Sequence, residues 1–136
     1  KSHVMIKKAK EKKISKKESY FTTNLESWKY TGKFDVIFSM EALYYSVPME
    51  PALTKVYKLL RPQGVFYCGT DFYKDNTLTT RWIKDMAVPM DLRSEKEWRK
   101  MFKDIGFNTR TKHVLDPKNK SKWKREFGTL FVIGKK

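Results

Sequence analysis

The sequence has few glycines, one cysteine and few acidic residues. Only six glycines occur among 136 residues, and G-x-G does not occur. This excludes a glycine-rich phosphate-binding turn of that pattern within these residues. The single cysteine, Cys68, lies in a strand-like segment and excludes an internal disulfide. One unpaired cysteine is typical of a reducing compartment, so we predict a cytoplasmic protein.

Long apolar runs and metal-ligand clusters are also missing. No apolar stretch approaches the roughly 20 residues that cross a bilayer, and the first residues do not form a secretory signal. We therefore expect no membrane partner. His3 and His113 have no cysteine or carboxylate at ligand spacing, so we expect no metal site.

Positive charge is abundant. The chain carries 30 Lys and Arg against 15 Asp and Glu, a formal net charge of +15. Such an excess suggests an anionic partner such as nucleic acid, and lysines concentrate in residues 7–17 and 118–124. The alternative is a lysine-rich solvated surface with no specific partner.

The middle of the chain predicts a strand, a helix and a second strand. Residues 36–38 form an apolar run typical of a strand buried on both faces. Two prolines then precede apolar residues at helical spacing, which "RPQG" (residues 61–64) ends. The apolar run at residues 65–70 follows. A strand–helix–strand unit with so short a loop indicates parallel strands, and hence an α/β fold.

The flanking segments predict further elements. We expect a surface helix over residues 4–14 and a brief strand near residues 20–22. Residues 71–92 resemble a lid or insert, in which Trp82, Met86 and Met90 either roof an apolar pocket or pack onto the sheet.

The clearest helix begins at Ser94, which forms an S-x-x-E capping box with Glu97, and ends at Gly106. Strands at residues 108–115 and 129–133 close the chain as an antiparallel pair at the sheet edge. Trp98, Met101, Phe102 and Ile105 form the apolar stripe of this helix. We expect Cys68, Trp98, Met101 and Phe102 to lie in the core.

This ordered set of segments resembles class I S-adenosylmethionine-dependent methyltransferases with the Rossmann-like fold, of the small-molecule type. "FDVIFSMEALYYSV" is similar to the family's fourth-strand motif, "LLRPQG" to the turn before its fifth strand, and "GTLFVIGKK" to its last strand. The resemblance implies one methyltransferase domain over residues 1–136. Its parts are an adenine-side helix and strand (1–33), the crossover (34–70), the lid or insert (71–93), and a helix with two strands (94–136).

The resemblance implies S-adenosylmethionine as cofactor. "YFTTNLESW" is similar to the adenine-binding segment, with Asn24 where the family has aspartate and Leu25 offering its backbone N–H. Ser39 and Met40 would lie near the methionine end of the cofactor. Ligands of open parallel sheets bind outside the carboxyl ends of the strands. The residues that follow the two strands are therefore candidates for acceptor binding: Glu41, Tyr44, Tyr45, Asp71 and Tyr73.

Several of these candidates have simpler interpretations. Glu41 either contacts the cofactor or acts as a base, or it is a solvated residue at a helix start. One of the two tyrosines can instead pack in the core, and Asp71 can cap a turn. No residue is assigned as the general base.

The family's glycine-rich turn and the acidic residue that closes its second strand do not occur in these residues. We expect the first two strands to be missing, because the sequence begins where the helix after strand two should begin. Three explanations stay open: a C-terminal portion of a longer protein, a sheet completed by a partner chain, or a domain that has lost cofactor binding.

The predicted function is methyl transfer from S-adenosylmethionine to a small-molecule acceptor. The first alternative is an RNA methyltransferase or RNA-binding member of the fold, suggested by the charge. Against this alternative, the sequence has no Asn-Pro-Pro-Tyr type of motif after the fourth strand, where "SMEALYY" stands instead. The second alternative is a catalytically silent methyltransferase-like partner protein.

Overall fold

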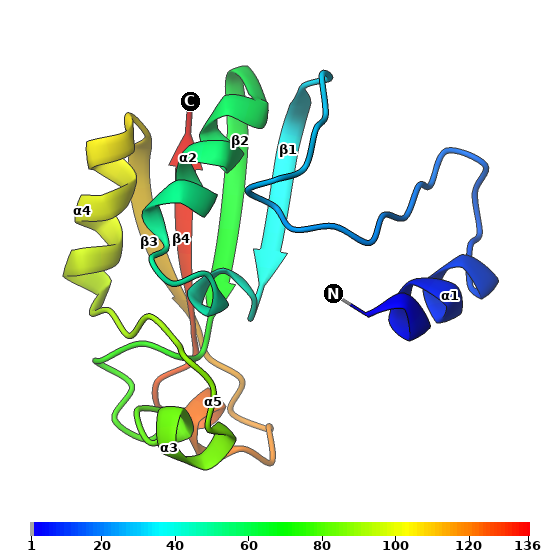
Figure 1. Cartoon of the computed structure of the whole chain (residues 1–136). Helices are drawn as coiled ribbons and strands as arrows, with labels where there is room; N and C mark the ends of the chain where they lie inside the picture. The colour runs from blue at the N-terminus through cyan, green and yellow to red at the C-terminus, as the bar shows by residue number, and fades with distance from the viewer. Residues whose placement is uncertain (1) are drawn as a thin grey trace. The chain divides into compact units, whose positions relative to one another are not determined.

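Four strands pair into one mixed sheet in the computed structural model, which describes residues 2–136. β1 and β2 are parallel, and β4 runs antiparallel to both β2 and β3. The predicted α/β fold, its parallel crossover and its antiparallel C-terminal pair are therefore confirmed. The spatial order (Figure 1) is β1 (Phe34–Met40), β2 (Leu60–Thr70), β4 (Thr129–Lys135) and β3 (Asn108–Val114).

The chain clusters into two compact units, one ending at Tyr30 and one spanning Thr31–Lys136. In the first unit, helix α1 (His3–Glu11) begins where the Ser2 hydroxyl accepts a hydrogen bond from the Met5 N–H. The helix predicted over residues 4–14 is thus confirmed, although it ends three residues earlier.

The strand predicted near residues 20–22 was wrong, because the segment carries no strand in the described structure. The described residues of the first unit contain no strand that could pair with this segment, and an unpaired extended segment has no backbone hydrogen bonds to stabilise it. Aromatic contacts order this region instead. The ring centroids of Phe21 and Trp28 lie 5.5 Å apart, and those of Trp28 and Tyr30 lie 4.8 Å apart.

Two helices cover one face of the sheet. They are α2 (Glu50–Leu59) and α4 (Glu95–Ile105), and they contribute Leu53 and Trp98 to the core. Phe66 of β2 is fully buried against α4, with its ring stacked on Phe102 at 5.6 Å between centroids. The predicted core positions Cys68, Trp98, Met101 and Phe102 are all buried.

The start and end of α4 follow from its own residues. The Ser94 hydroxyl accepts from the Glu97 N–H, and the Glu97 carboxylate accepts from the Ser94 N–H. Gly106 ends the helix with a φ angle of 113°, a backbone conformation that residues other than glycine rarely adopt. The predicted capping box is confirmed.

The prediction that residues 36–38 are buried on both faces was wrong. Val36 is 57% exposed and Phe38 is 63% exposed. Both side chains lie on the face opposite to Ile37, and no helix of the second unit covers that face of β1. β1 is also an edge strand of the described sheet.

The second predicted strand begins earlier than expected. "RPQG" does not separate α2 from the strand; it forms the first part of β2, since Leu60 already pairs with Phe34. The register then shifts, and Val65 pairs with Val36. The extra residues of β2 form a bulge-like irregularity that accommodates Pro62 and Gly64 within the strand.

The remaining short helices gather beyond the carboxyl ends of β1 and β2. They are η1 (Leu43–Tyr45), α3 (Trp82–Met86) and α5 (Lys122–Glu126). Figure 1 shows α3 and α5 below the ends toward which the two strands point. No helix within residues 2–136 is both long enough and apolar enough to traverse a bilayer.

Candidate active site

An open cavity of about 490 Å³ lies at the carboxyl ends of β1 and β2. Glu41 directly follows β1 and Asp71 directly follows β2, so the two parallel strands bring these carboxyl groups to the same edge of the sheet. The lining residues come from these strand ends and from the three short helices: Glu41, Tyr44, Tyr45, Asp71, Trp82, Asp85, Met86, Trp123 and Lys124.

Glu41 connects the two strands. Its backbone N–H donates to the Gly69 carbonyl at 3.0 Å, and its φ of 51° places it in the left-handed region. This conformation is unfavourable for a residue other than glycine by about 1 kcal/mol. Its carboxylate accepts from the Asp71 N–H at 2.5 Å and from the Tyr44 hydroxyl at 3.0 Å. The side chain is therefore fixed across the strand ends.

Asp71 is buried and fully paired. Its side chain is 4% exposed and lies 2.6 Å from the Lys124 Nζ. One carboxylate oxygen accepts from the Thr129 hydroxyl at 2.6 Å, and the other accepts from the Trp123 indole N–H at 3.3 Å. Because these donors come from α5 and β4, the carboxylate fastens the basic segment between β3 and β4 to the strand end.

Aromatic rings form the walls of the cavity. The Trp82 and Trp123 rings meet at 87°, with centroids 5.4 Å apart. The ring centroids of Tyr44 and Tyr45 lie 4.5 Å apart, and the ring of the buried Phe72 stacks on that of Trp82 with centroids 6.2 Å apart. The aromatic residues that line the cavity belong to the short helices η1, α3 and α5.

The surroundings of the cavity raise the pKa values of two of its groups. Burial, and then repulsion from the Asp71 carboxylate, raises the pKa of Glu41 to about 7. Burial, and then the Glu41 carboxylate, also raises the pKa of the Tyr44 hydroxyl. Glu41 is thus a carboxyl group that can hold or release a proton near neutral pH.

The structure brings four of the predicted acceptor-side residues together in this cavity, namely Glu41, Tyr44, Tyr45 and Asp71. It does not bring Tyr73 there. The Tyr73 side chain is buried, and its hydroxyl donates to the Phe127 carbonyl at 3.1 Å and to the Gly128 carbonyl at 3.3 Å. In this position it supports the turn before β4.

The predicted cofactor residues fall in both units. Ser39 and Met40 end β1, where Ser39 is half-buried and Met40 is 37% exposed. Asn24 and Leu25 belong to the first unit, next to a turn in which the Trp28 N–H donates to the Leu25 carbonyl at 3.3 Å. The cofactor roles of these four residues stay predictions.

The insert contributes to the cavity in part. Trp82 and Met86 line the cavity, which agrees with the interpretation that the insert borders a pocket. Met90 is buried and is not among the lining residues. Sequence reasoning missed Asp85, Trp123 and Lys124. The signal for the last two was a tryptophan alone in the basic run "KSKWKRE", because a large apolar side chain among lysines needs a partner elsewhere in the fold.

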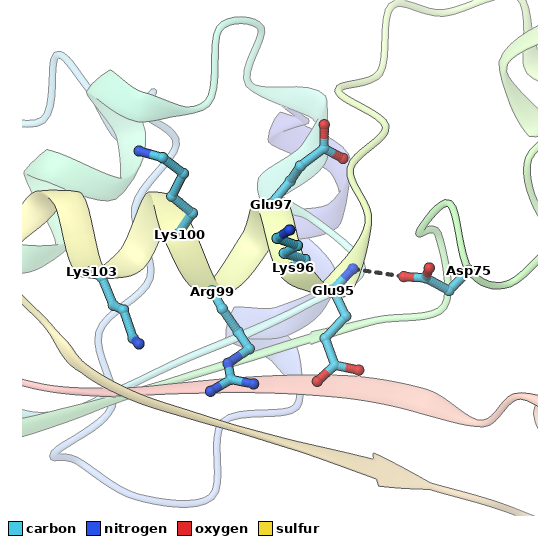
Figure 2. A pocket seen from close by; sticks show the side chains of 7 residues that line it. All are labelled: Asp75, Glu95, Lys96, Glu97, Arg99, Lys100 and Lys103. Carbon is cyan, nitrogen blue, oxygen red and sulfur yellow. Dashed lines mark hydrogen bonds between the residues drawn. The ribbon is translucent and has the colours of Figure 1, made fainter.

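A larger depression of about 790 Å³ follows α4, away from this site. Its lining is entirely charged: Asp75, Glu95, Lys96, Glu97, Arg99, Lys100 and Lys103. Figure 2 shows these side chains projecting on different sides of the helix, with the Glu95 N–H donating to Asp75 at 2.7 Å. Several of the charges are paired locally, as Lys100 is with Asp104 at 2.6 Å. This arrangement is typical of a solvated helix face, and a nucleic-acid partner stays a prediction from the net charge.

The solved structures that superpose on this chain include proteins named as methyltransferases. A protein assigned as a methyltransferase, in complex with the Trm112 methyltransferase activator of Haloferax volcanii, superposes with a TM-score of 0.91 at 23% identity; the match covers 98% of this chain and 68% of that one. The N-methyltransferase NodS of Bradyrhizobium japonicum, in complex with S-adenosyl-L-homocysteine, gives 0.62 at 16% identity, with 86% and 53% covered.

Magnesium protoporphyrin IX methyltransferase of Synechocystis, also with bound S-adenosylhomocysteine, gives a TM-score of 0.67 at 14% identity. The match covers 97% of this chain and 59% of that protein, so the chain spans a little over half the length of the latter two enzymes. No curated protein sequence matches the chain. The model of the methyltransferase domain matches residues 1–112, most of the chain, and the chain therefore belongs to that family.

Proposed function

We propose that this protein takes part in methyl transfer from S-adenosylmethionine to a small-molecule acceptor bound in the cavity at the ends of β1 and β2. The observation that carries the proposal is the position of Glu41, Tyr44 and Asp71 around one cavity at the carboxyl ends of two parallel strands. This is the edge of an open α/β sheet at which ligands bind.

The chemistry of the cavity fits such a cofactor. A sulfonium is a cation, and aromatic ring faces and carboxylates interact favourably with cations. We assign Ser39 and Met40 to the methionine end of S-adenosylmethionine, and we assign Asn24 and Leu25 to its adenine. When bound, S-adenosylmethionine supplies an activated methyl group.

The protein's own residues would orient the acceptor and exclude water. The rings of Tyr45, Trp82 and Trp123 shape a surface on which a small molecule can be held, and positioning of this kind is a large part of catalysis when the methyl donor is already activated. Glu41 would accept a proton from the acceptor, because its pKa of about 7 matches neutral pH.

Calorimetric titration with S-adenosylhomocysteine tests the proposal. Met40→Glu places a charge at the end of β1, and we expect it to weaken binding at least tenfold. The matched control is Val36→Glu on the same face of the same strand, since Val36 is also exposed but lies farther from the cavity. Failure of the intact, full-length protein to bind would reject the proposal and favour a catalytically silent partner protein.

A second proposal concerns assembly with an activator protein. It is favoured by the TM-score of 0.91 to a methyltransferase-assigned protein solved with the Trm112 activator. Co-expression with a Trm112-type protein and size-exclusion chromatography test it. Co-elution as a stoichiometric complex supports the proposal, and separate elution at micromolar concentration contradicts it.

A further inference from the structure

The cavity has a charge opposite to that of the protein around it. Basic residues outnumber acidic ones two to one in the sequence, with 30 against 15. The charged groups of the lining are the carboxyl groups of Glu41, Asp71 and Asp85 and the ammonium of Lys124. Asp71 is paired with Lys124 at 2.6 Å and Asp85 with Arg81 at 2.8 Å, so within the described residues Glu41 is the lining carboxyl group that has no ion pair. A positively charged ligand therefore meets a locally favourable potential here and an unfavourable one over most of the remaining surface.

The walls of the cavity are suited to a cation of small size. The Trp82 and Trp123 rings stand nearly perpendicular, at 87°, and the exposed Tyr45 adds a further ring, which packs against the buried Tyr44. Met86 completes the lining with a polarisable sulfur, 3.9 Å from the Tyr45 hydroxyl. Aromatic rings and a carboxylate that line the same cavity are groups that proteins use to bind ammonium ions.

An anionic acceptor fits this cavity poorly. Its negative charge would approach Glu41 and Asp71 within a partly desolvated site. The Lys124 ammonium could bind it only by leaving the buried Asp71 carboxylate unpaired, which is costly. A neutral apolar acceptor would gain contact with the rings but nothing from the carboxylates. The lining thus favours a cation over both alternatives.

We propose that the acceptor is a small molecule that carries an amine, and that the cavity recognises its ammonium form between the Tyr45, Trp82 and Trp123 rings, beside the Glu41 carboxylate. This inference rests on the proposed function, since it names the acceptor class for the same site. Tyr45 is the specificity-determining ring that can be altered most safely, because it is 46% exposed.

Two probes that differ only in charge test the proposal. Choline carries a quaternary ammonium, and its neutral isostere has a carbon atom in place of the nitrogen. We expect the 136-residue chain to bind choline at least about tenfold more tightly than the isostere, as measured by calorimetry and tryptophan fluorescence. Tyr45→Leu should remove most of this preference and Tyr45→Phe should retain it, because the ring face and not the hydroxyl binds the cation.

The outcomes separate this inference from the proposed function. Equal binding of the two probes, or no binding of choline, overturns the amine assignment whatever the S-adenosylhomocysteine titration shows. If Tyr45→Leu weakens binding of S-adenosylmethionine but not of S-adenosylhomocysteine, and leaves choline unaffected, the rings recognise the sulfonium of the cofactor and the amine assignment is again overturned. Failure of S-adenosylhomocysteine to bind, with the choline preference intact, rejects the proposed function and leaves the cavity as an ammonium-binding site that does not hold a methyl acceptor.

Discussion

Two ion pairs at opposite ends of the β1–β2 pair have the same length and very different surroundings. Asp35 and Arg61, at the amino end, lie 2.6 Å apart with side chains 76% and 55% exposed. Asp71 and Lys124, at the carboxyl end, also lie 2.6 Å apart, with side chains 4% and 28% exposed. Equal distance does not mean equal energy, because water weakens the first pair and is largely excluded from the second.

The difference shows where the sheet fixes its polar groups. At the amino end both side chains are more than half exposed, and water screens the attraction between them. At the carboxyl end the Asp71 carboxylate also accepts from Thr129 and Trp123, so removal of any one partner affects the others. A fixed polar network is what a binding site needs, and the Asp71 carboxylate belongs to one at the end of the sheet where the cavity lies.

The largest effect that distinguishes the two ends is expected from Lys124→Met. The variant keeps the length of the side chain but leaves a buried carboxylate without its cation, and we expect the free energy of unfolding to fall by about 3 kcal/mol. Urea unfolding followed by fluorescence measures it. Lys122→Met in the same helix is the control, since the Lys122–Glu126 pair is exposed and 3.6 Å long. A loss below about 1 kcal/mol for Lys124→Met would contradict the comparison.

The next effect concerns the pH dependence of stability. The pKa of Glu41 is raised from 4.5 to about 7, so the folded protein holds a proton that the unfolded chain releases between these values. The contribution of Glu41 to stability is therefore fully present below about pH 4.5 and is lost as pH rises through about 7. We expect this loss to reach about 2 kcal/mol, after allowance for the partial exposure of the group.

Glu41→Gln should remove that dependence. As pH rises from 4.5 to 8, the parent should lose stability that the variant keeps, so the unfolding free energy of the variant should rise relative to that of the parent. The lowered pKa values of Glu95 and Glu97 act in the opposite direction, but they are common to both proteins and cancel in the difference. Parallel pH profiles for the two proteins would show that Glu41 is not perturbed.

A smaller effect separates the cavity from the residues that support it. Tyr73→Phe removes a buried hydroxyl that donates to two backbone carbonyls, and we expect a loss of about 1 kcal/mol in stability. Binding of choline and of S-adenosylhomocysteine should be unchanged. Tyr45→Phe is the control and should leave stability within about 0.5 kcal/mol, because Tyr45 is exposed. A changed affinity in Tyr73→Phe would restore the acceptor-side role predicted from the sequence.

The smallest effect is expected at the amino end. Arg61→Ala breaks the exposed pair with Asp35, and we expect a change of at most about 0.5 kcal/mol that disappears at high salt. Thermal unfolding at two ionic strengths measures it. A loss comparable to that of Lys124→Met would mean that the amino end is covered in solution, and the contrast between the two ends would no longer hold.

Much of the fold was predictable because its signals are local. The capping box at Ser94, the stop at Gly106 and the helical spacing of Trp98 and Phe102 each depend on residues within a few positions of one another. The strand near residues 20–22 failed for the opposite reason: a strand exists only when a second strand pairs with it. The burial of Val36 and Phe38 failed likewise, since burial depends on what covers a face and not on the side chains themselves.

Local signals in the sequence are enough to predict the order of β1, α2, β2, α4, β3 and β4 and to place Glu41 and Asp71 at the ends of two parallel strands, because capping, periodicity and chain connectivity act over short distances. The packing of distant segments determines which side chains meet there. It paired Asp71 with Lys124, joined Trp82 to Trp123 across 41 positions, and directed the Tyr73 hydroxyl to the turn before β4. Such contacts arise only when distant segments pack together, and burial then sets the energy of every charge among them.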